Sequence, residues 1–163
     1  MMPRYIIAFS VPFVHGKARP RWGQGHMHMA KSDRDAEKAI WEAYAGASLR
    51  TYGRIVTAPP KVGVKLTVRM HGTMPKSRPK RCGDVEGYTE KPDIDNAVKL
   101  VLDALNTQTK ADRATGARVE VRPGAWADDK QIVDLDAAKV ARVRGADEHM
   151  DVTVEWPHGK DGN

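Results

Sequence analysis

Two aspartates and a lysine lie close together in the middle of the chain, where Asp93, Asp95 and Lys99 follow Pro92. Side chains two residues apart point in opposite directions in a regular helix, but to the same side in an extended segment. The proline favours extended backbone before it, and non-helical dihedral angles are normal at the start of a helix. We therefore expect the carboxylates of Asp93 and Asp95 to converge on one point. Lys99 should share the helix face of Asp95 because it follows four residues later.

A further acidic pair, Asp128 and Asp129, opens a later apolar stretch of the chain. Neither this pair nor Asp93 and Asp95 has a Cys or His beside it in the sequence. Carboxylate oxygens without nitrogen or sulfur donors are the ligands that suit Mg²⁺ or Mn²⁺ and not zinc. The sequence therefore predicts a site for a hard divalent cation, formed by three or four of these carboxylates.

Each of these residues also has a simpler interpretation, which the sequence leaves open. Asp93 could cap a helix. Lys99 could be a helical ion-pair partner of Asp95 and Asp103, which lie four residues away on either side. The pair at 128–129 could form a turn.

Several other ion and phosphate motifs are excluded or weak. An EF-hand loop that begins at Asp93 would need Gly and Glu where the chain has Val98 and Ala104. The sequence has no GxxxxGK[ST] phosphate loop and no GxGxxG fingerprint. His26 and His28 have a spacing that could ligate metal from a strand, although surface or packing histidines are the commoner interpretation.

Positive charge concentrates in the first part of the chain and negative charge in the second. The net charge is +6, and residues 1–91 hold 17 of the 27 basic side chains, whereas residues 92–163 hold 14 of the 21 acidic ones. This asymmetry suits a protein that holds a polyanion and keeps carboxylates for metal, and a solvated basic surface is the alternative. Two basic clusters are candidates for nucleic-acid contact: Lys17, Arg19 and Arg21, and Lys76, Arg78, Lys80 and Arg81.

The elements that must position these residues are predicted by apolar periodicity. Alternation and β-branched residues indicate strands at 4–11, 61–70, 131–143 and 150–156. Helical spacing indicates one helix from Ser32, the predicted N-cap, and a strongly amphipathic helix from Ile94. This order predicts an α+β domain in which two main helices pack on a small mixed β-sheet.

Three stretches between these elements lack regular periodicity. Residues 13–29 are expected to be a loop with a short hairpin, and residues 73–91 a long, mobile and basic loop. Residues 106–125 are polar, with an alternation near residue 120 that is typical of a hairpin arm. Loops of this length are usually functional or disordered.

Length and composition limit the remaining classes. The 163 residues suit one domain with a real core, spanning the whole chain. The single cysteine, Cys82, cannot form an internal disulfide, so the chain requires no oxidising compartment. Prolines and an arginine interrupt the apolar N-terminus, which argues against a signal peptide, and no stretch approaches the roughly 18 apolar residues of a membrane span. We expect a cytoplasmic location and no membrane partner.

Two motifs, KPDIDNAVKLVLDALN at 91–106 and WADDKQIVDL at 126–135, resemble the RusA family of Holliday junction resolvases. These are small phage and prophage endodeoxyribonucleases. GKARPRW at 16–22 and MPKSRPKR at 74–81 are similar to the family as well, so the likeness covers most of residues 5–140. The combination of D-x-D-N-x-x-K with W-x-D-D-x-Q is a specific signal.

The resemblance implies a homodimeric, Mg²⁺-dependent nuclease that resolves four-way DNA junctions by paired nicks, with Mn²⁺ as a substitute ion. It implies that Asp93, Asp95 and Asp129 bind metal, that Lys99 is the catalytic lysine, and that Asp128 is a further candidate ligand. A junction needs two cuts related by a two-fold axis, so one site per chain implies a symmetric dimer. The two basic clusters would contact backbone phosphates.

The sequence departs from the family pattern at one place. Residues 107–125 separate the two motifs, which follow each other within a few residues in the family. Two other functions are left open by the sequence. One is a nuclease for flap or fork DNA that uses the same site, and the other is a DNA-binding module whose acidic cluster is structural.

Overall fold

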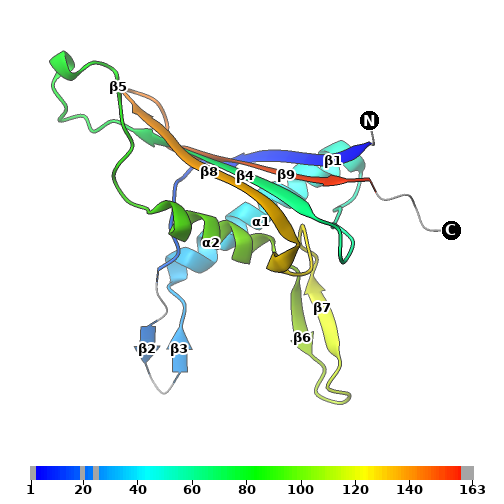
Figure 1. The fold of residues 1–163 in the computed structure, drawn as a ribbon. Helices are drawn as coiled ribbons and strands as arrows, with labels where there is room; N and C mark the ends of the chain where they lie inside the picture. Colours follow the sequence, from blue (N-terminus) through cyan, green and yellow to red (C-terminus); the bar gives the residue numbers. More distant parts are fainter. Residues whose placement is uncertain (1–2, 19–20, 24–25, 159–163) are drawn as a thin grey trace.

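The computed structural model describes residues 3–18, 21–23 and 26–158, and its largest element is a five-stranded sheet with the order β1–β9–β4–β8–β5 (Figure 1). These strands are β1 (Arg4–Val11), β9 (His149–Pro157), β4 (Val64–Thr73), β8 (Ile132–Val143) and β5 (Val85–Glu86). β4 and β8 are parallel, and all other neighbours are antiparallel. The sheet is therefore mixed, which confirms the predicted α+β class.

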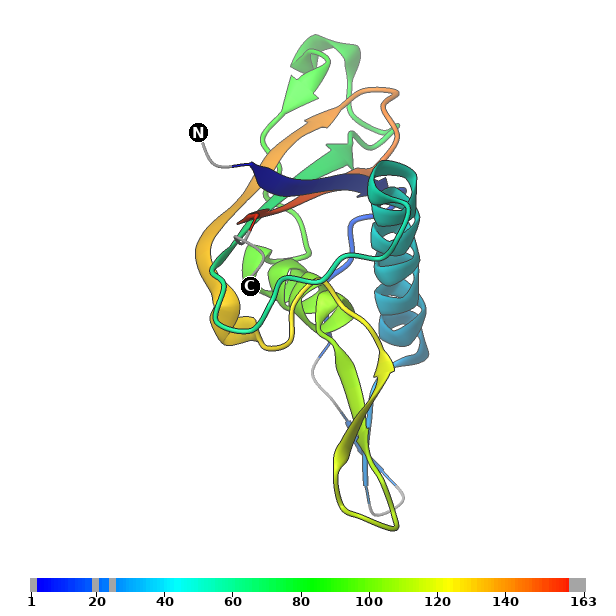
Figure 2. The same cartoon turned by 90° about the vertical axis from the view of Figure 1, so that its right-hand side faces the viewer.

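Two helices, α1 (Lys31–Tyr52) and α2 (Ile94–Leu105), cover one face of this sheet (Figures 1 and 2). α1 packs against β1 and α2, and α2 also contacts β8. In the described part of the chain, no helix combines the length and the apolar character needed to cross a membrane.

The core lies between the sheet and the two helices, as the alternation along β4 predicted. Every second residue of β4 is buried. Full burial of such aliphatic side chains stabilises the fold by about 1.5–3 kcal/mol each. The almost fully buried side chains of β4, β9 and both helices include Leu66, Met70, Val154, Trp156, Ile40, Tyr44, Leu100 and Leu105.

The opposite face of the sheet, which no helix covers, is polar. We call it the open face, and its residues include Ser10, Lys65, Arg69, His71, Asp134, Asp136, His149 and Asp151. Cross-strand ion pairs form on it, such as Lys65 with Asp134 at 3.5 Å. The two faces thus differ as alternating strands require.

Helix α1 begins two residues earlier than predicted, because Ala30 and not Ser32 is its N-cap. Ala30 holds that position in extended conformation, without a side-chain cap, and its carbonyl accepts a hydrogen bond from the Asp33 N–H at 3.1 Å. The buried Asp33 carboxylate accepts a hydrogen bond from the Ala18 N–H at 3.0 Å and lies 2.8 Å from Nε2 of His15. A tertiary contact therefore connects the segment after β1 to the start of α1.

Helix α2 has the amphipathic pattern that the sequence predicted. Its buried residues are Ala97, Val98, Leu100, Val101, Ala104 and Leu105. Asp93 is the N-cap residue, with φ −68° and ψ 149°, so the backbone at the start of the helix is extended as expected. The carbonyl of Asp93 accepts the N–H of Ala97 at 3.1 Å.

The residues between the two motifs form a hairpin of β6 (Gln108–Ala111) and β7 (Arg118–Arg122). Its two ends meet at a narrow neck. The Thr107 N–H donates to the Trp126 carbonyl at 2.9 Å, and the Ala125 N–H donates to the Leu105 carbonyl at 2.7 Å. A Cβ atom on Gly124 would lie only 2.2 Å from the Leu105 carbonyl oxygen, so this close approach requires glycine.

The neck brings together the two sequence motifs that contain the candidate site residues. The chain leaves the body after α2, forms the hairpin and returns to the same place, where Asn106 and Trp126 form a parallel bridge. The Trp41 Nε1–H on α1 donates to the Pro123 carbonyl at 2.7 Å and fixes the returning strand. The two motifs are therefore neighbours in space, although residues 107–125 separate them in sequence.

A second hairpin, of β2 (Arg21–Gly23) and β3 (His26–His28), forms within the stretch expected to contain one. Both hairpins project from the helix-covered side of the domain (Figures 1 and 2). One follows Lys17, whose N–H donates to the Asn96 carbonyl near the start of α2 at 3.0 Å, and the other follows the end of α2. α2 therefore lies between the bases of the two hairpins.

Candidate active site along helix α2

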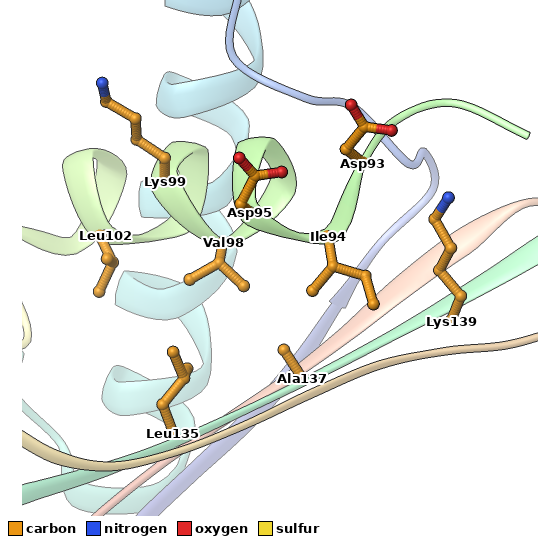
Figure 3. A pocket seen from close by; sticks show the side chains of 9 residues that line it. All are labelled: Asp93, Ile94, Asp95, Val98, Lys99, Leu102, Leu135, Ala137 and Lys139. Atoms are coloured by element: carbon orange, nitrogen blue, oxygen red, sulfur yellow. The ribbon is translucent and has the colours of Figure 1, made fainter.

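The two faces of α2 differ sharply in polarity. In Figure 3 the side chains of Asp93, Asp95 and Lys99 lie on the side of the helix away from β8. Ile94, Val98 and Leu102 point toward Leu135 and Ala137 of β8. Together these side chains line an open groove of about 670 Å³, whose rim is charged and whose floor is apolar.

Asp93 and Asp95 present free carboxylates at the start of this groove. Both residues are exposed. The Asp93 side chain makes no capping hydrogen bond, so the interpretation of Asp93 as only a helix cap is not supported by the structure. Since the carboxylates lie on one side of the helix start and have no protein partner among the described residues, they are available to a cation.

Lys99 is one helical turn beyond Asp95 on the same side of α2 (Figure 3). Its ammonium has no carboxylate within 4.0 Å among the described residues, so it pairs with neither Asp95 nor Asp103. The simple helical ion pair that the sequence left open is therefore not formed. Lys99 instead presents an exposed positive charge to the rim of the groove.

Asp129 is held at the other end of α2 by the tryptophan of the second motif. The buried Trp126 donates its indole N–H to Oδ1 of Asp129 at 3.1 Å. Burial raises the pKa of Asp129, and repulsion from Asp103 and Asp128 adds to this, while the indole hydrogen bond partly opposes it. A half-buried carboxylate beside two other carboxylates is a site that favours a bound cation or a proton.

Asp128 has a structural partner that Asp129 lacks. Its side chain accepts the Lys130 N–H at 3.0 Å and lies 3.2 Å from the Lys130 ammonium, as part of a capping box completed by Gln131. These interactions, first among them the backbone hydrogen bond, lower the pKa of Asp128. The turn interpretation therefore describes Asp128, which favours a positioning role over metal binding.

The four predicted carboxylates do not form one closed cage. Asp129 is within electrostatic range of Asp103, which is eight residues, or about 12 Å of helix, beyond Asp95. Within the described residues, Asp93, Asp95 and Asp129 are not a set whose side-chain oxygens all come within 4.8 Å of one another. Asp93 and Asp95 lie at one end of the charged row on α2, and Asp129 interacts electrostatically with Asp103 at the other end.

Lys17 has partners that the sequence did not indicate. Its ammonium forms ion pairs with Asp103 and, at 3.1 Å, with Glu37 of α1. Burial opposes the charge, but hydrogen bonds and attraction from these carboxylates outweigh it and raise the pKa of Lys17. Lys17 therefore joins the loop to both helices. Arg19 lies outside the described residues, and Arg21 is in β2.

The second basic cluster lies in the loop that precedes α2. Lys76, Lys80 and Arg81 are exposed there, whereas Arg78 pairs with Glu86 at 2.9 Å. The guanidinium of Arg144 donates to the backbone carbonyls of residues 78, 79 and 83, which anchors the loop to the end of β8. All four predicted side chains are therefore exposed on an anchored loop, and three of them have no ion-pair partner among the described residues.

Two functional candidates were missed by the sequence interpretation. Lys139 of β8 lines the same groove, lies over the Tyr88 ring at 5.0 Å and donates to the Glu90 carbonyl. The alternation that places Leu135 and Ala137 on the helix side of β8 also places Lys139 there, so the signal was present. Asp103 was considered only as a partner of Lys99, although the i, i+4, i+8 spacing from Asp95 puts it in the same row.

Comparison with known proteins agrees with the motifs. A family model described as "Endodeoxyribonuclease RusA" matches residues 12–123. This range includes Asp93, Asp95 and Lys99 and ends shortly before Asp128. "Uncharacterized protein YqaN" of Bacillus subtilis (strain 168) is 30% identical over 137 residues, which cover 80% of this chain and 82% of that protein.

Proposed function

Because the chain belongs to the RusA family of endodeoxyribonucleases, we propose that it is a Mg²⁺-dependent nuclease that cuts four-way DNA junctions from the groove along α2. One observation supports this proposal most. Two exposed carboxylates and one exposed ammonium lie on the same side of α2 without protein partners among the described residues. Charged groups left uncompensated beside a groove suit a cation and an anionic substrate.

The residues present fit a magnesium ion. Mg²⁺ is usually bound through one or two carboxylates, with waters and substrate phosphates as its other ligands, and not by a full protein cage. Asp93 and Asp95 offer such a pair, and Asp129, at the other end of the row, would hold a separate ion. When bound, the ion supplies an activated water and stabilises charge on the phosphoryl oxygens.

The remaining charged residues have separate roles in this proposal. Lys99, as a compact positive charge, would contact the scissile phosphate and stabilise the charge that develops there. Trp126 would hold the Asp129 carboxylate in one orientation through its indole N–H. The turn built by Asp128 and Gln131 would fix the start of β8 below the groove.

Basic residues are frequent in the segments that adjoin this row. The hairpin at 107–123 carries four basic and two acidic side chains, Lys17 and Arg19 precede the other hairpin in sequence, and Arg21 is part of it. Since α2 lies between the bases of both hairpins, backbone contacts from each side would place a DNA strand along it. Lys76, Lys80 and Arg81 would extend the contact before α2. Two opposed cuts in one junction would require a homodimer with one site in each chain.

The test is a nicking assay on four DNAs of matched length: a four-way junction, a replication fork, a flap and a linear duplex. We expect paired nicks in the junction with Mg²⁺ or Mn²⁺, slower cutting of the other DNAs and no cutting with EDTA. Preferred cutting of fork or flap would assign the other nuclease function. Binding to all four DNAs without any nicking would identify a DNA-binding module and refute the enzyme proposal.

A further inference from the structure

A second group of metal-binding side chains lies on the open face, away from α2. His71 of β4 is the cross-strand neighbour of His149 of β9, and Asp151 follows two residues later on the same face. Nε2 of His71 lies 3.1 Å from Oδ2 of Asp151, and Nε2 of His149 lies 3.6 Å from the same oxygen. We propose that these three side chains bind a borderline divalent metal ion, with Zn²⁺ as the preferred ion.

The spacing of the donor atoms matches a tetrahedral zinc site. Zinc binds imidazole nitrogen at about 2.0–2.1 Å and carboxylate oxygen at about 2.0–2.2 Å, which places neighbouring ligand atoms about 3.4 Å apart. The two nitrogen–oxygen distances fall on either side of this value. One ligand atom from each of the three residues lies within 4.8 Å of the others.

The surrounding groups orient two of the three ligands as in known metal sites. Nδ1 of His149 lies 2.9 Å from the Asp147 carbonyl oxygen, which can only accept, so in the neutral ring Nδ1 carries the proton and Nε2 has a free lone pair. The Ser10 hydroxyl donates to Oδ1 of Asp151, which leaves Oδ2 for the ion. Backbone carbonyls and hydroxyls that fix ligand orientation in this way are the usual second layer of a metal centre.

The donor set separates this site from the groove along α2. Two imidazoles and one carboxylate suit zinc and its neighbours among the transition metals, whereas carboxylates alone suit Mg²⁺. Three protein ligands leave a fourth position for water. The side chains of His71, His149 and Asp151 are 30%, 38% and 45% exposed, so an ion can enter from solvent.

Metal binding requires one local adjustment. The two imidazole rings are stacked, with centroids 4.3 Å apart and an angle of 6° between their planes. Each ring must turn about its χ2 angle to direct Nε2 at a shared ion, and this angle is soft in histidine. A change in ring stacking on metal addition is therefore a specific signature of the site.

Zinc titration by calorimetry at neutral pH, on protein without an affinity tag, tests the proposal. We expect one Zn²⁺ per chain, at least tenfold weaker binding in His71→Gln, His149→Gln and Asp151→Asn, and about tenfold weaker binding in Ser10→Ala. His158→Gln is the matched control, because His158 stacks on Tyr5 outside the group. A His26→Gln/His28→Gln variant must retain the binding, which separates the site from these two histidines.

NMR of the imidazole nitrogens gives a second test that needs no variant at the site. We expect Zn²⁺ to shift Nε2 of His71 and His149 and to leave His158 unchanged. Unchanged affinity in all three ligand variants, or no shift at either histidine, would refute the site. The inference does not rest on the nuclease proposal, because both measurements are made without DNA.

Discussion

Helix α2 and the open face of the sheet carry two ligand sets that differ in how complete they are. On the helix side, Asp93 and Asp95 present carboxylates that no described protein group orients. On the open face, Asp151 and His149 are each fixed by a further hydrogen bond from Ser10 or to Asp147. The first set needs substrate and water to complete a coordination shell, whereas the second is nearly complete within the protein.

This difference predicts different ion behaviour. A site that depends on substrate phosphates should bind Mg²⁺ weakly without DNA and more tightly with it. A site with its own oriented donors should bind Zn²⁺ without DNA. The following variants test this comparison, and open-face residues serve as controls for residues along α2.

The largest effect is expected from the acidic pair on α2. Asp93→Asn and Asp95→Asn should each lower single-turnover cleavage of a junction by about 10³-fold, because each removes a negative charge that would hold the ion. Junction binding should be retained, since loss of negative charge reduces repulsion of DNA. The control is Asp134→Asn, an exposed carboxylate of the open face. Near-parental cleavage by either α2 variant would remove that residue from the site.

Lys99 should give the next largest effect. Lys99→Ala should lower single-turnover cleavage by about 10²-fold, as for loss of one electrostatic stabiliser, and Lys99→Arg should also be strongly impaired because its donor geometry differs. Lys65→Ala, which breaks an exposed pair on the open face, is the control and should change little. Cleavage within threefold of the parent in both Lys99 variants would leave this lysine without a catalytic role.

Substitutions in the basic loop at 73–91 should weaken DNA binding without changing the rate of the cleavage step. Replacing Lys76, Lys80 and Arg81 by Gln should weaken binding to every DNA form and reduce the slope of log K against log salt by about 0.9 for each phosphate that the loop no longer neutralises. Binding isotherms at several salt concentrations measure this slope. The matched triple variant of the open face, Arg4, Lys65 and Arg69 to Gln, should leave it unchanged. Equal salt-dependence slopes for the two triple variants would show that DNA does not contact this loop.

The smallest effect is a difference in pH dependence between two aspartates. The folded-state pKa of Asp129 is raised, chiefly by burial, so stability is lost as the pH rises from the unfolded-state pKa through the higher folded-state pKa. Asp129→Asn should therefore raise Tm at pH 7 by less than about 4 °C, and the gain should disappear as the pH falls below the unfolded-state pKa of about 4.

Asp136 on the open face should behave in the opposite way. A hydrogen bond from Arg69 lowers its pKa, so its contribution to stability is present above the unfolded-state pKa and is lost as the pH falls through the lower folded-state value. Asp136→Asn should therefore not raise Tm at pH 7. Thermal melting of both variants at pH 3–8 measures the contrast, and the same sign of change at pH 7 would contradict it.

Sequence alone determined the elements and the residues within one continuous segment. Alternation predicted β1, β4, β8 and β9, and the spacing of apolar residues predicted α2, because these periods follow from local backbone geometry. The position of Asp93 and Asp95 at the start of a helix was predicted for the same reason. The motifs on 91–106 and 126–135 also indicated the family that the comparisons show.

Only the tertiary structure decided which distant residues meet. The neck at Gly124 joins two motifs that the sequence separates, and the pairing of Lys17 with Glu37 and Asp103 depends on how both helices pack. Asp103, and not Asp95, is the α2 carboxylate that acts on the pKa of Asp129. His71 and His149 became neighbours through the register of β4 and β9. Strand register and helix packing depend on contacts between residues far apart in the chain. A local pattern of residue types does not specify these contacts.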